Sequence, residues 1–393
     1  MSAPSAIEVR NLTKIYELPK LQRTWRQQLD PVRKPAVDSV SFSIKKGELF
    51  VIMGLSGSGK STLLRMLNRL VEPTSGETVI AGLSINGLKQ KDLRTTRNET
   101  INMVFQHFAI FPHRTVLENA AYGLQVRGME RAEREARAME ALKTVGLEEW
   151  AHELPGALSG GMRQRVGLAR GLATDAEILL MDEPFSALDP LIRRDMQDLL
   201  LKLQDKLQKT IVFVTHDLNE AMRLGDRIMV MRDGKVIQLG TAGEILARPA
   251  DPYVAKFVSD VDRSRVVTAQ EVMREPLLTA ARDESAGDVL ARLANAEAHG
   301  IYVLDQRGCV IGAVSAEALS RGVQEGAQSL AQIPTAEYST VDSLTLLSEL
   351  FPLVGRNCVP LGITDPSGRL VGVLSVAALL AALSDTERRF ENA

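Results

Sequence analysis

Residues 54–62 read Gly-Leu-Ser-Gly-Ser-Gly-Lys-Ser-Thr, and this stretch decides the fold of the first part of the chain. The apolar residues 49–53 before it predict a buried strand, and residues 63–68 after it predict the first turns of a helix. Glycines in this context let backbone N–H groups converge on phosphate oxygens, beside the positive end of a helix dipole. A flexible linker is the alternative, but a linker does not join a buried strand directly to an apolar helix.

The same stretch predicts a site for a nucleoside triphosphate and Mg²⁺. Lys60 is placed to reach the β- and γ-phosphates, and the Ser61 hydroxyl to hold Mg²⁺. Such a loop alone fits kinases, GTPases and ATPases, so other residues must decide between them. The predicted nucleotide contacts in the loop are Gly54, Ser56, Gly57, Ser58, Gly59, Lys60, Ser61 and Thr62.

Composition limits the class of protein. The 393 residues are 45% hydrophobic and 24% charged, which is typical of soluble globular proteins of two or three domains. The net charge of −2 gives no general basic surface, so we expect no nucleic-acid partner. The first residues lack the apolar core of a signal peptide, and no apolar run is long enough to span a bilayer. Cys309 and Cys358 lack metal-ligand spacing and suit a reducing cytosol.

Strands alternate with helices through the first two thirds of the chain, which predicts an α/β fold with a parallel sheet covered by helices. Residues 17–36 are polar and basic, and we expect an inserted helix or loop there. The predicted strands are residues 7–16, 37–44, 49–53, 178–181 and 211–215, and the predicted helices are residues 128–145 and 190–207, with Pro190 at a helix start.

Two acidic residues follow the apolar strand 178–181 directly. Asp182 is placed to hold Mg²⁺ through water, and Glu183 to polarise the attacking water as a general base. A second predicted anion site lies at Ser159, Gly160 and Gly161, at the N-terminus of another helix. A solvent-facing strand end and a serine-capped helix are the simpler alternatives, which the phosphate loop disfavours.

These stretches together resemble the motifs of the ABC ATPases. Residues 158–162 are similar to the family's signature motif, with Met162 in place of the usual glutamine. The resemblance implies ATP and Mg²⁺ as ligands. It also implies that Gln106 reaches Mg²⁺ and the attacking water, and that His216 contacts the γ-phosphate. Asp189 matches the family's loop that signals between subunits.

The resemblance covers residues 6–260 and implies a P-loop ABC ATPase domain with a mostly parallel sheet, an antiparallel β subdomain and a helical subdomain. In this family the signature of one domain closes the phosphate site of another. Because the chain holds one set of motifs, the resemblance implies a second ATPase chain, most simply an identical one. Tyr16 matches the position of the family's adenine-stacking aromatic residue, and a packing role for Tyr16 or Trp25 is the alternative.

The sequences of four segments resemble those of the glycine betaine/proline betaine importer ATPases. These segments are residues 103–113, 158–170, 185–193 and 220–227. This resemblance implies a subunit that energises uptake of quaternary ammonium osmoprotectants from the cytoplasmic face of the inner (plasma) membrane. Its partners would be transmembrane permease subunits and a separate substrate-binding protein. The alternatives are an importer ATPase for an amino acid, choline or carnitine, a non-transport ABC ATPase, and a nucleotide sensor without ATPase activity.

Composition shifts near residue 262, since residues 263–393 contain no lysine and are net −5, whereas residues 1–262 are net +3. A repeat within this tail resembles a tandem pair of CBS modules, α+β units that often bind adenine nucleotides. The predicted domains are residues 1–262, 263–322 and 323–385. Ala318 and Ala378 stand where CBS modules place a ribose-binding aspartate, so we expect a regulatory or dimerising role with an undefined regulatory ligand. Asp305, Gly308, Gly312, Ser315 and Leu319 recur as Asp365, Gly368, Gly372, Ser375 and Leu379.

Overall fold

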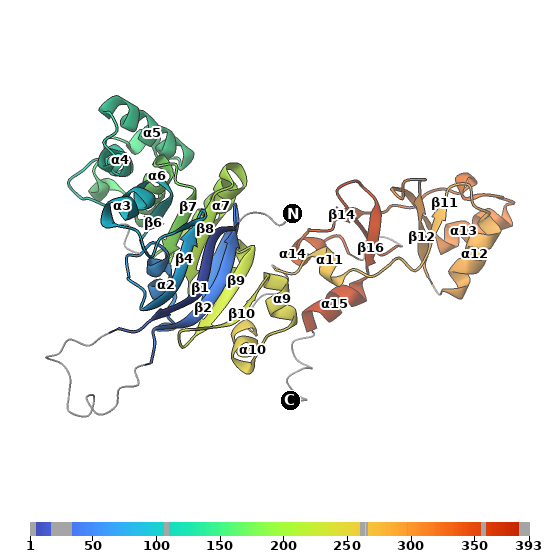
Figure 1. Ribbon diagram of the computed structural model, residues 1–393. Helices are drawn as coiled ribbons and strands as arrows, with labels where there is room; N and C mark the ends of the chain where they lie inside the picture. The colour runs from blue at the N-terminus through green and yellow to red at the C-terminus, as the bar shows by residue number, and fades with distance from the viewer. Residues whose placement is uncertain are drawn as a thin grey trace. The chain divides into compact units, whose positions relative to one another are not determined.

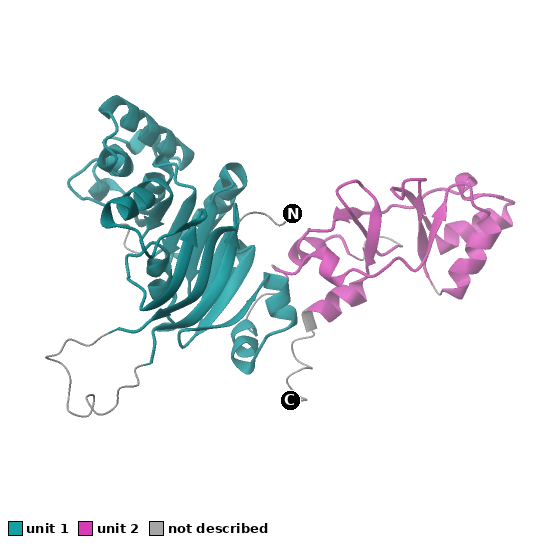
Figure 2. Cartoon of the chain, viewed as in Figure 1, with its two compact units in different colours: residues 1–260 teal, residues 261–393 magenta. Residues whose placement is uncertain are grey.

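A computed structural model describes residues 5–16, 34–105, 110–259, 264, 266–296, 298–354 and 359–384. The chain divides into two compact units, residues 1–260 and residues 261–393 (Figure 2). Most of the predicted insertion after Tyr16, and also Trp25, Gln106 and Cys358, lie outside the described residues.

The first unit is built on a six-stranded sheet whose strands run parallel except for one edge strand (Figure 1). The strand before the phosphate loop is central, and its last residue, Met53, lies opposite Thr215. In the neighbouring parallel pair, formed by residues 178–182 and 210–215, Asp182 lies opposite Val214. Parallel pairing therefore brings the carboxyl ends of three strands to one edge. The strand order is β10 (Lys235–Gly240), β9 (Arg227–Arg232), β3 (Leu49–Met53), β8 (Thr210–Thr215), β7 (Ile178–Asp182) and β6 (Ile101–Val104).

A second, antiparallel sheet shares a hydrophobic core with the first. Phe42 of this sheet stacks on Phe50 of the central strand, with ring centroids 5.4 Å apart. The shared core also takes in the apolar face of α2 (Lys60–Leu67), so the helix after the phosphate loop is anchored from both sides. The strand order is β2 (Val37–Lys45), β1 (Ser5–Lys14), β4 (Ser75–Ile80) and β5 (Leu83–Ser84).

Helices α4, α5 and α6 form a separate bundle beyond the end of the central sheet (Figure 1), which confirms the predicted helical subdomain. The predicted helix 128–145 begins later than expected, at Arg131, because Gly128 has a left-handed φ of 76° and Glu130 caps the helix. Helix α7 begins at Pro190 as predicted. The helices of this unit are α2, α3 (Gln90–Glu99), α4 (Val116–Val126), α5 (Arg131–Thr144), α6 (Gly160–Ala173), α7 (Pro190–Leu207), α8 (Leu218–Leu224), α9 (Ala242–Ala247) and α10 (Pro252–Val258).

The second unit contains two three-stranded sheets of the same design, as the repeat predicts. In each, the first two strands pair in parallel and the last two form an antiparallel hairpin. Gly308 and Gly368 close the two hairpin turns with positive φ values of 83° and 81°. The elements are α11 (Ala269–Val272), β11 (Thr279–Ala281), α12 (Ala286–Asn295), β12 (Gly300–Leu304), β13 (Val310–Ser315), α13 (Ala316–Gln324), β14 (Thr340–Asp342), α14 (Leu347–Leu350), β15 (Leu361–Thr364), β16 (Leu370–Leu374) and α15 (Val376–Ser384).

In this unit, segments from each repeat pack into the hydrophobic core of the other repeat. Helix α11 precedes the first sheet in the chain, yet Ala269 is buried in the core of the second sheet. Leu330 and Ile333 come after α13, the last helix of the first repeat, yet they are buried in the core of the first sheet. The two halves therefore complete each other's cores. The boundaries at residues 262 and 322 stay predictions.

Candidate active site

The phosphate loop joins β3 to α2, and two of its glycines are required by close contacts. Gly54 has a φ of 151°, and a Cβ atom there would lie 2.2 Å from the carbonyl oxygen of Met231. Gly59 has a φ of 100°, and its Cβ would lie 2.3 Å from the Ala36 carbonyl oxygen. Ser56 and Gly57 form the exposed tip of the loop. Any side chain at Gly54 or Gly59 would displace the loop.

A buried serine and a buried lysine lie within this loop. The Ser58 hydroxyl oxygen is buried and has no hydrogen-bond partner among the described residues, so it is free to meet a ligand. Lys60 Nζ donates to the carbonyl oxygens of Gly54 at 2.8 Å and Leu55 at 3.1 Å. Burial lowers the pKa of Lys60, and the carboxylate of Glu183, 4.0 Å from Nζ, opposes that shift.

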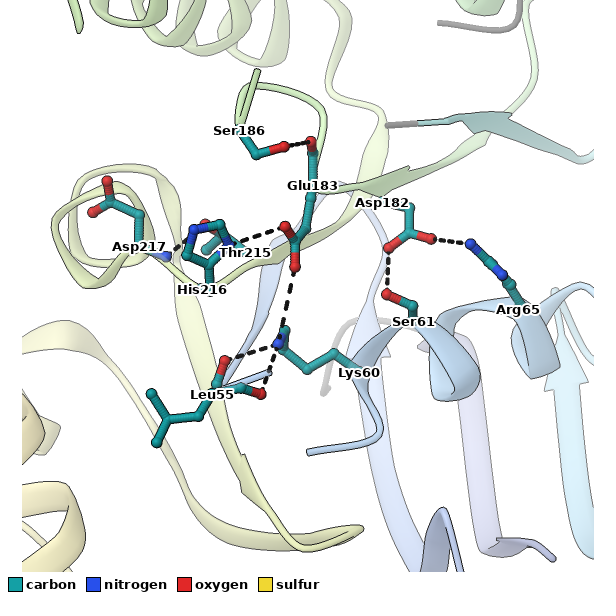
Figure 3. A network of polar contacts seen from close by, with 11 residues as sticks. Leu55, Lys60, Ser61, Arg65, Asp182, Glu183, Ser186, Thr215, His216 and Asp217 are labelled. Carbon is teal, nitrogen blue, oxygen red and sulfur yellow. Dashed lines mark hydrogen bonds and ion pairs between the residues drawn. The ribbon is translucent and has the colours of Figure 1, made fainter. Parts of the chain in front are cut away.

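Asp182 lies at the end of β7 and receives two hydrogen bonds from α2. The hydroxyl of Ser61 donates to its Oδ1 at 2.7 Å, and Nη2 of Arg65 donates to its Oδ2 at 3.0 Å (Figure 3). The Asp182 side chain is 3% exposed, so these donors offset the cost of burying its charge. Two of the three residues predicted to hold Mg²⁺, Ser61 and Asp182, thus lie side by side.

Glu183 follows directly and points between His216 and Lys60 (Figure 3). Its Oε2 lies 2.9 Å from Nδ1 of His216. The backbone of Glu183 is left-handed, with a φ of 46°, which is strained for a residue with a side chain. Its N–H donates to the carbonyl oxygen of Val214, and the hydroxyl of Ser186 donates to its own carbonyl oxygen. These contacts hold the strained turn, which aims the carboxylate into the site.

Tyr16 lies beside the loop, two residues after the end of β1. Its hydroxyl and the Thr62 hydroxyl are 3.3 Å apart, and the Tyr16 side chain is 51% exposed. Nζ of Lys14 lies 5.1 Å from the centre of the Tyr16 ring. An exposed aromatic face beside the phosphate loop suits base stacking, and the adenine contact stays a prediction.

Four other predicted residues lie outside this cluster, three at the start of α6 and one at the start of α7. Ser159 caps α6 by accepting from the N–H of Met162, and the contacts of the described residues do not join Ser159, Gly160 or Gly161 to the phosphate loop. Gly161 packs against Ile192, since a Cβ at Gly161 would lie 2.4 Å from the Ile192 side chain. The exposed Asp189 caps α7 by accepting from the N–H of Ile192.

Models of two protein families match the chain, "ABC transporter" over residues 37–186 and "CBS domain" over residues 269–325. The chain is 45% identical to the glycine betaine/carnitine transport ATP-binding protein of Listeria monocytogenes, over 98% of both chains. It is 45% identical to the glycine betaine/proline betaine transport system ATP-binding protein of Escherichia coli, over 96% of this chain and 97% of that one.

The chain belongs to the glycine betaine/proline betaine family of ABC transporter ATP-binding subunits.

A solved structure supports the nucleotide assignment for this ABC ATP-binding subunit. An ATP-binding cassette in a dimeric post-hydrolysis state, bound to ADP and phosphate, matches with a TM-score of 0.53 and 38% identity. The match covers 60% of this chain and 98% of that one. The chain is therefore an ABC ATPase with the fold of a nucleotide-binding cassette. No helix among the described residues is both long and apolar enough to cross a bilayer.

Two arginines of this ATP-binding subunit contact the site and are missing from the sequence-based predictions. Arg65 pairs with Asp182, and Arg193 pairs with Asp217, the residue after His216. Arginines on amphipathic helices usually face solvent, so the sequence gives no local signal for either contact. Gln106 follows the described strand β6, and its own position lies outside the described residues.

Proposed function

We propose that this chain is the ATP-hydrolysing subunit of an importer for glycine betaine, proline betaine or related quaternary ammonium compounds. One observation carries the proposal. Lys60, Asp182, Glu183 and His216 meet at one edge of the sheet in a chain that aligns over nearly its whole length with transport ATP-binding proteins. The printed names of those relatives assign them glycine betaine, proline betaine or carnitine, which defines the proposed solute class.

In the proposed reaction, Glu183 accepts a proton from the attacking water as the water oxygen bonds to the γ-phosphorus of ATP. The bond between the γ-phosphorus and the bridging oxygen breaks at the same time, and that oxygen leaves as part of ADP. His216 holds the Glu183 carboxylate in place and lies where it can donate to a γ-phosphate oxygen. Lys60 neutralises charge on the β- and γ-phosphates, where Glu183 and Asp182 keep a positive charge favourable despite burial. The oxygens of Ser61 and Asp182 fit Mg²⁺, which keeps several waters and needs few protein ligands. Mg²⁺ would supply charge neutralisation at the phosphates, with Gln106 as a further proposed ligand.

We also propose that the complete site needs a second ATPase chain, most simply an identical one. Ser159, Gly160 and Gly161 lead into a helix N-terminus that the first chain's own phosphate loop does not use. Such a helix end suits a phosphate from a neighbouring chain. Asp189 would lie at the junction of the two chains.

The remaining partners follow from the proposed transport role. Transmembrane permease subunits and a separate substrate-binding protein would complete the importer, and this chain would work at the cytoplasmic face of the inner membrane. Residues 1–262 would form the ATPase domain. Residues 263–322 and 323–385 would form two CBS modules that regulate it, with an undefined ligand.

Transport tests this function directly. The full chain is purified with the permease subunits that accompany it and reconstituted, with a binding protein, into vesicles containing ATP. We expect uptake of labelled glycine betaine that stops when Lys60→Ala replaces the wild-type chain. ATP hydrolysis without uptake of glycine betaine, proline betaine, choline or carnitine would remove the importer proposal. Ending the chain at Ser264 tests the tail: we expect ATPase activity to remain while its dependence on salt or adenine nucleotides changes.

A further inference from the structure

Arg193 ties together two loops that follow neighbouring strands of the central sheet. It lies in the first turn of α7, and Nη2 of its guanidinium donates to the carbonyl oxygen of Leu188 at 3.1 Å. Nη1 of the same group donates to Oδ2 of Asp217 at 3.2 Å. Leu188 belongs to the loop that begins at Glu183, and Asp217 follows His216. One planar guanidinium therefore holds an acceptor from each loop, which a lysine could not do with the same geometry.

Asp217 is held from three directions. Its Oδ1 accepts from the N–H of Glu220 at 3.2 Å and caps α8, while its own N–H donates to the Thr215 hydroxyl at 2.9 Å. Its Oδ2 takes the bond from Arg193. The side chains of Arg193 and Asp217 are 29% and 32% exposed, so the pair is partly shielded from solvent. The backbone just after His216 consequently depends on this aspartate.

The contact between Glu183 and His216 lies between these two anchored points. Glu183 begins one loop and His216 begins the other, and their side chains meet at 2.9 Å. His216 is 56% exposed, so packing alone does not fix its ring. The strained φ of Glu183 also requires its loop to be held by other contacts. Arg193 contacts both loops, so it fixes the loop that carries Glu183 and the loop that carries His216 at the same time.

A second set of contacts joins α7 to α8 one turn further along. Nε2 of Gln197 donates to Oε1 of Glu220 at 3.1 Å, and Arg223 donates to both Gln197 and Asp198. Together with the packing of the two helices on the sheet, these contacts keep α7 and α8 associated without Arg193. Loss of the Arg193 side chain should therefore disturb the two loops more than the helix pair.

We propose that Arg193 is a positioning residue for the Glu183–His216 pair during ATP hydrolysis. It acts through Leu188 and Asp217 and makes no contact with the phosphate loop. The proposal rests on the roles given to Glu183 and His216 under the proposed function. Because nucleotide binding is assigned to the loop of β3 and α2, loss of Arg193 should lower kcat and leave the affinity for ATP unchanged.

The test uses the full chain carrying Arg193→Gln, Arg193→Lys or Arg194→Gln. We expect Arg193→Gln to lower kcat by about 10- to 100-fold, with KM and the affinity for a fluorescent ATP analogue within about twofold of wild type. Arg193→Lys should recover only part of kcat, since it reaches one acceptor. Arg194, the exposed neighbour on α7, is the matched control and should retain wild-type kcat. Combining Arg193→Gln with Asp217→Asn should lower kcat no further than the larger single effect.

A structural role is separated from a positioning role by Asp198→Ala, which removes an acceptor of the second set of contacts. We expect this variant to lower the unfolding midpoint as Arg193→Gln does, but to keep kcat. Equal losses of kcat in both variants, or a wild-type kcat in Arg193→Gln, would overturn the proposal. Glu183→Gln is measured in parallel. If Glu183→Gln is inactive while Arg193→Gln keeps wild-type kcat, only the proposal for Arg193 is wrong. If Glu183→Gln hydrolyses ATP at the wild-type rate, the assignment of Glu183 as the general base is wrong.

Discussion

Nδ1 of His216 lies 2.9 Å from Oε2 of Glu183, while Nζ of Lys60 lies 4.0 Å from the other carboxylate oxygen. Glu183 is thus placed between a group that orients it and a group that would carry phosphate charge. The strained backbone at Glu183 brings its carboxylate there, one residue after Asp182. This arrangement leads to the first prediction.

Glu183→Gln should reduce ATP hydrolysis by about 10²- to 10⁴-fold, the usual contribution of general-base catalysis. The amide keeps the size of the side chain but cannot accept the proton from water. ATP binding should persist, so the variant should accumulate as an ATP-bound dimer in size-exclusion chromatography. Glu177→Gln, at the opposite end of the same strand region, is the matched control. Turnover near wild type in Glu183→Gln would show that another group is the base.

Asp182→Asn should raise the Mg²⁺ concentration needed for half-maximal ATPase activity by about 10- to 100-fold, as loss of a group that orients a metal's ligands does. The amide has one acceptor oxygen where Asp182 now accepts from both Ser61 and Arg65. A Mg²⁺ titration of ATPase rates measures the effect. Asp175→Asn changes an exposed aspartate just before the same strand and should leave the titration unchanged. An unaltered Mg²⁺ requirement in Asp182→Asn would contradict the metal assignment.

Tyr16→Ala should raise the KM for ATP by about 5- to 150-fold if the ring stacks on adenine, corresponding to about 1–3 kcal/mol. Tyr16→Phe keeps the ring and loses only the hydroxyl beside Thr62, so its KM should stay near wild type. Steady-state kinetics of the two variants give the comparison. Equal KM values for Tyr16→Ala and wild type would leave Tyr16 as a packing residue.

Burial raises the pKa of Glu220 above its ordinary value of 4.5, with Asp217 adding to the shift and hydrogen bonds from Thr215 and Gln197 opposing it. Above that ordinary value the unfolded chain releases this proton while the folded chain keeps it. Glu220 therefore makes the free energy of unfolding fall as pH rises toward its folded pKa. In Glu220→Gln this contribution should disappear, because an amide does not titrate and still accepts from Gln197.

Urea unfolding between about pH 5 and pH 8 measures this difference. Both tryptophans, Trp25 and Trp150, precede residue 260, so their fluorescence reports on the first unit alone. The advantage of wild type over Glu220→Gln should shrink as pH rises. The exposed Glu149→Gln is the control. A difference between wild type and Glu220→Gln that stays constant with pH would refute the prediction.

Local patterns were enough to predict the parts of the site that lie on single strand-to-helix connections. The phosphate loop, Asp182 and Glu183 follow apolar strands, and Pro190 marks the start of α7, so spacing alone located them. Pairing between elements was not predictable in the same way. Arg65 reaches Asp182 across 117 positions of the chain, and no periodicity encodes such a contact.

The repeat in the second unit shows the same limit. Its matching residues predicted two similar sheets, and the structure has them. The exchange of α11 between them was not predicted, because Ala269 and its neighbours would suit either apolar core. Bridges from Thr268 to Leu346 and from Arg274 to Val373 place this segment with the second sheet.

That exchange has a consequence for how the second unit is made. The ribosome releases α11 early, but its partner strand β16 is among the last pieces to emerge. The apolar residues of α11 must remain without their native cover until synthesis of the unit is almost finished. Contacts this distant in the chain close slowly, so the second unit completes its folding after translation, whereas the first unit is fully synthesised before it. A nascent chain stalled before residue 370 should therefore carry a folded ATPase unit attached to an unfinished tail.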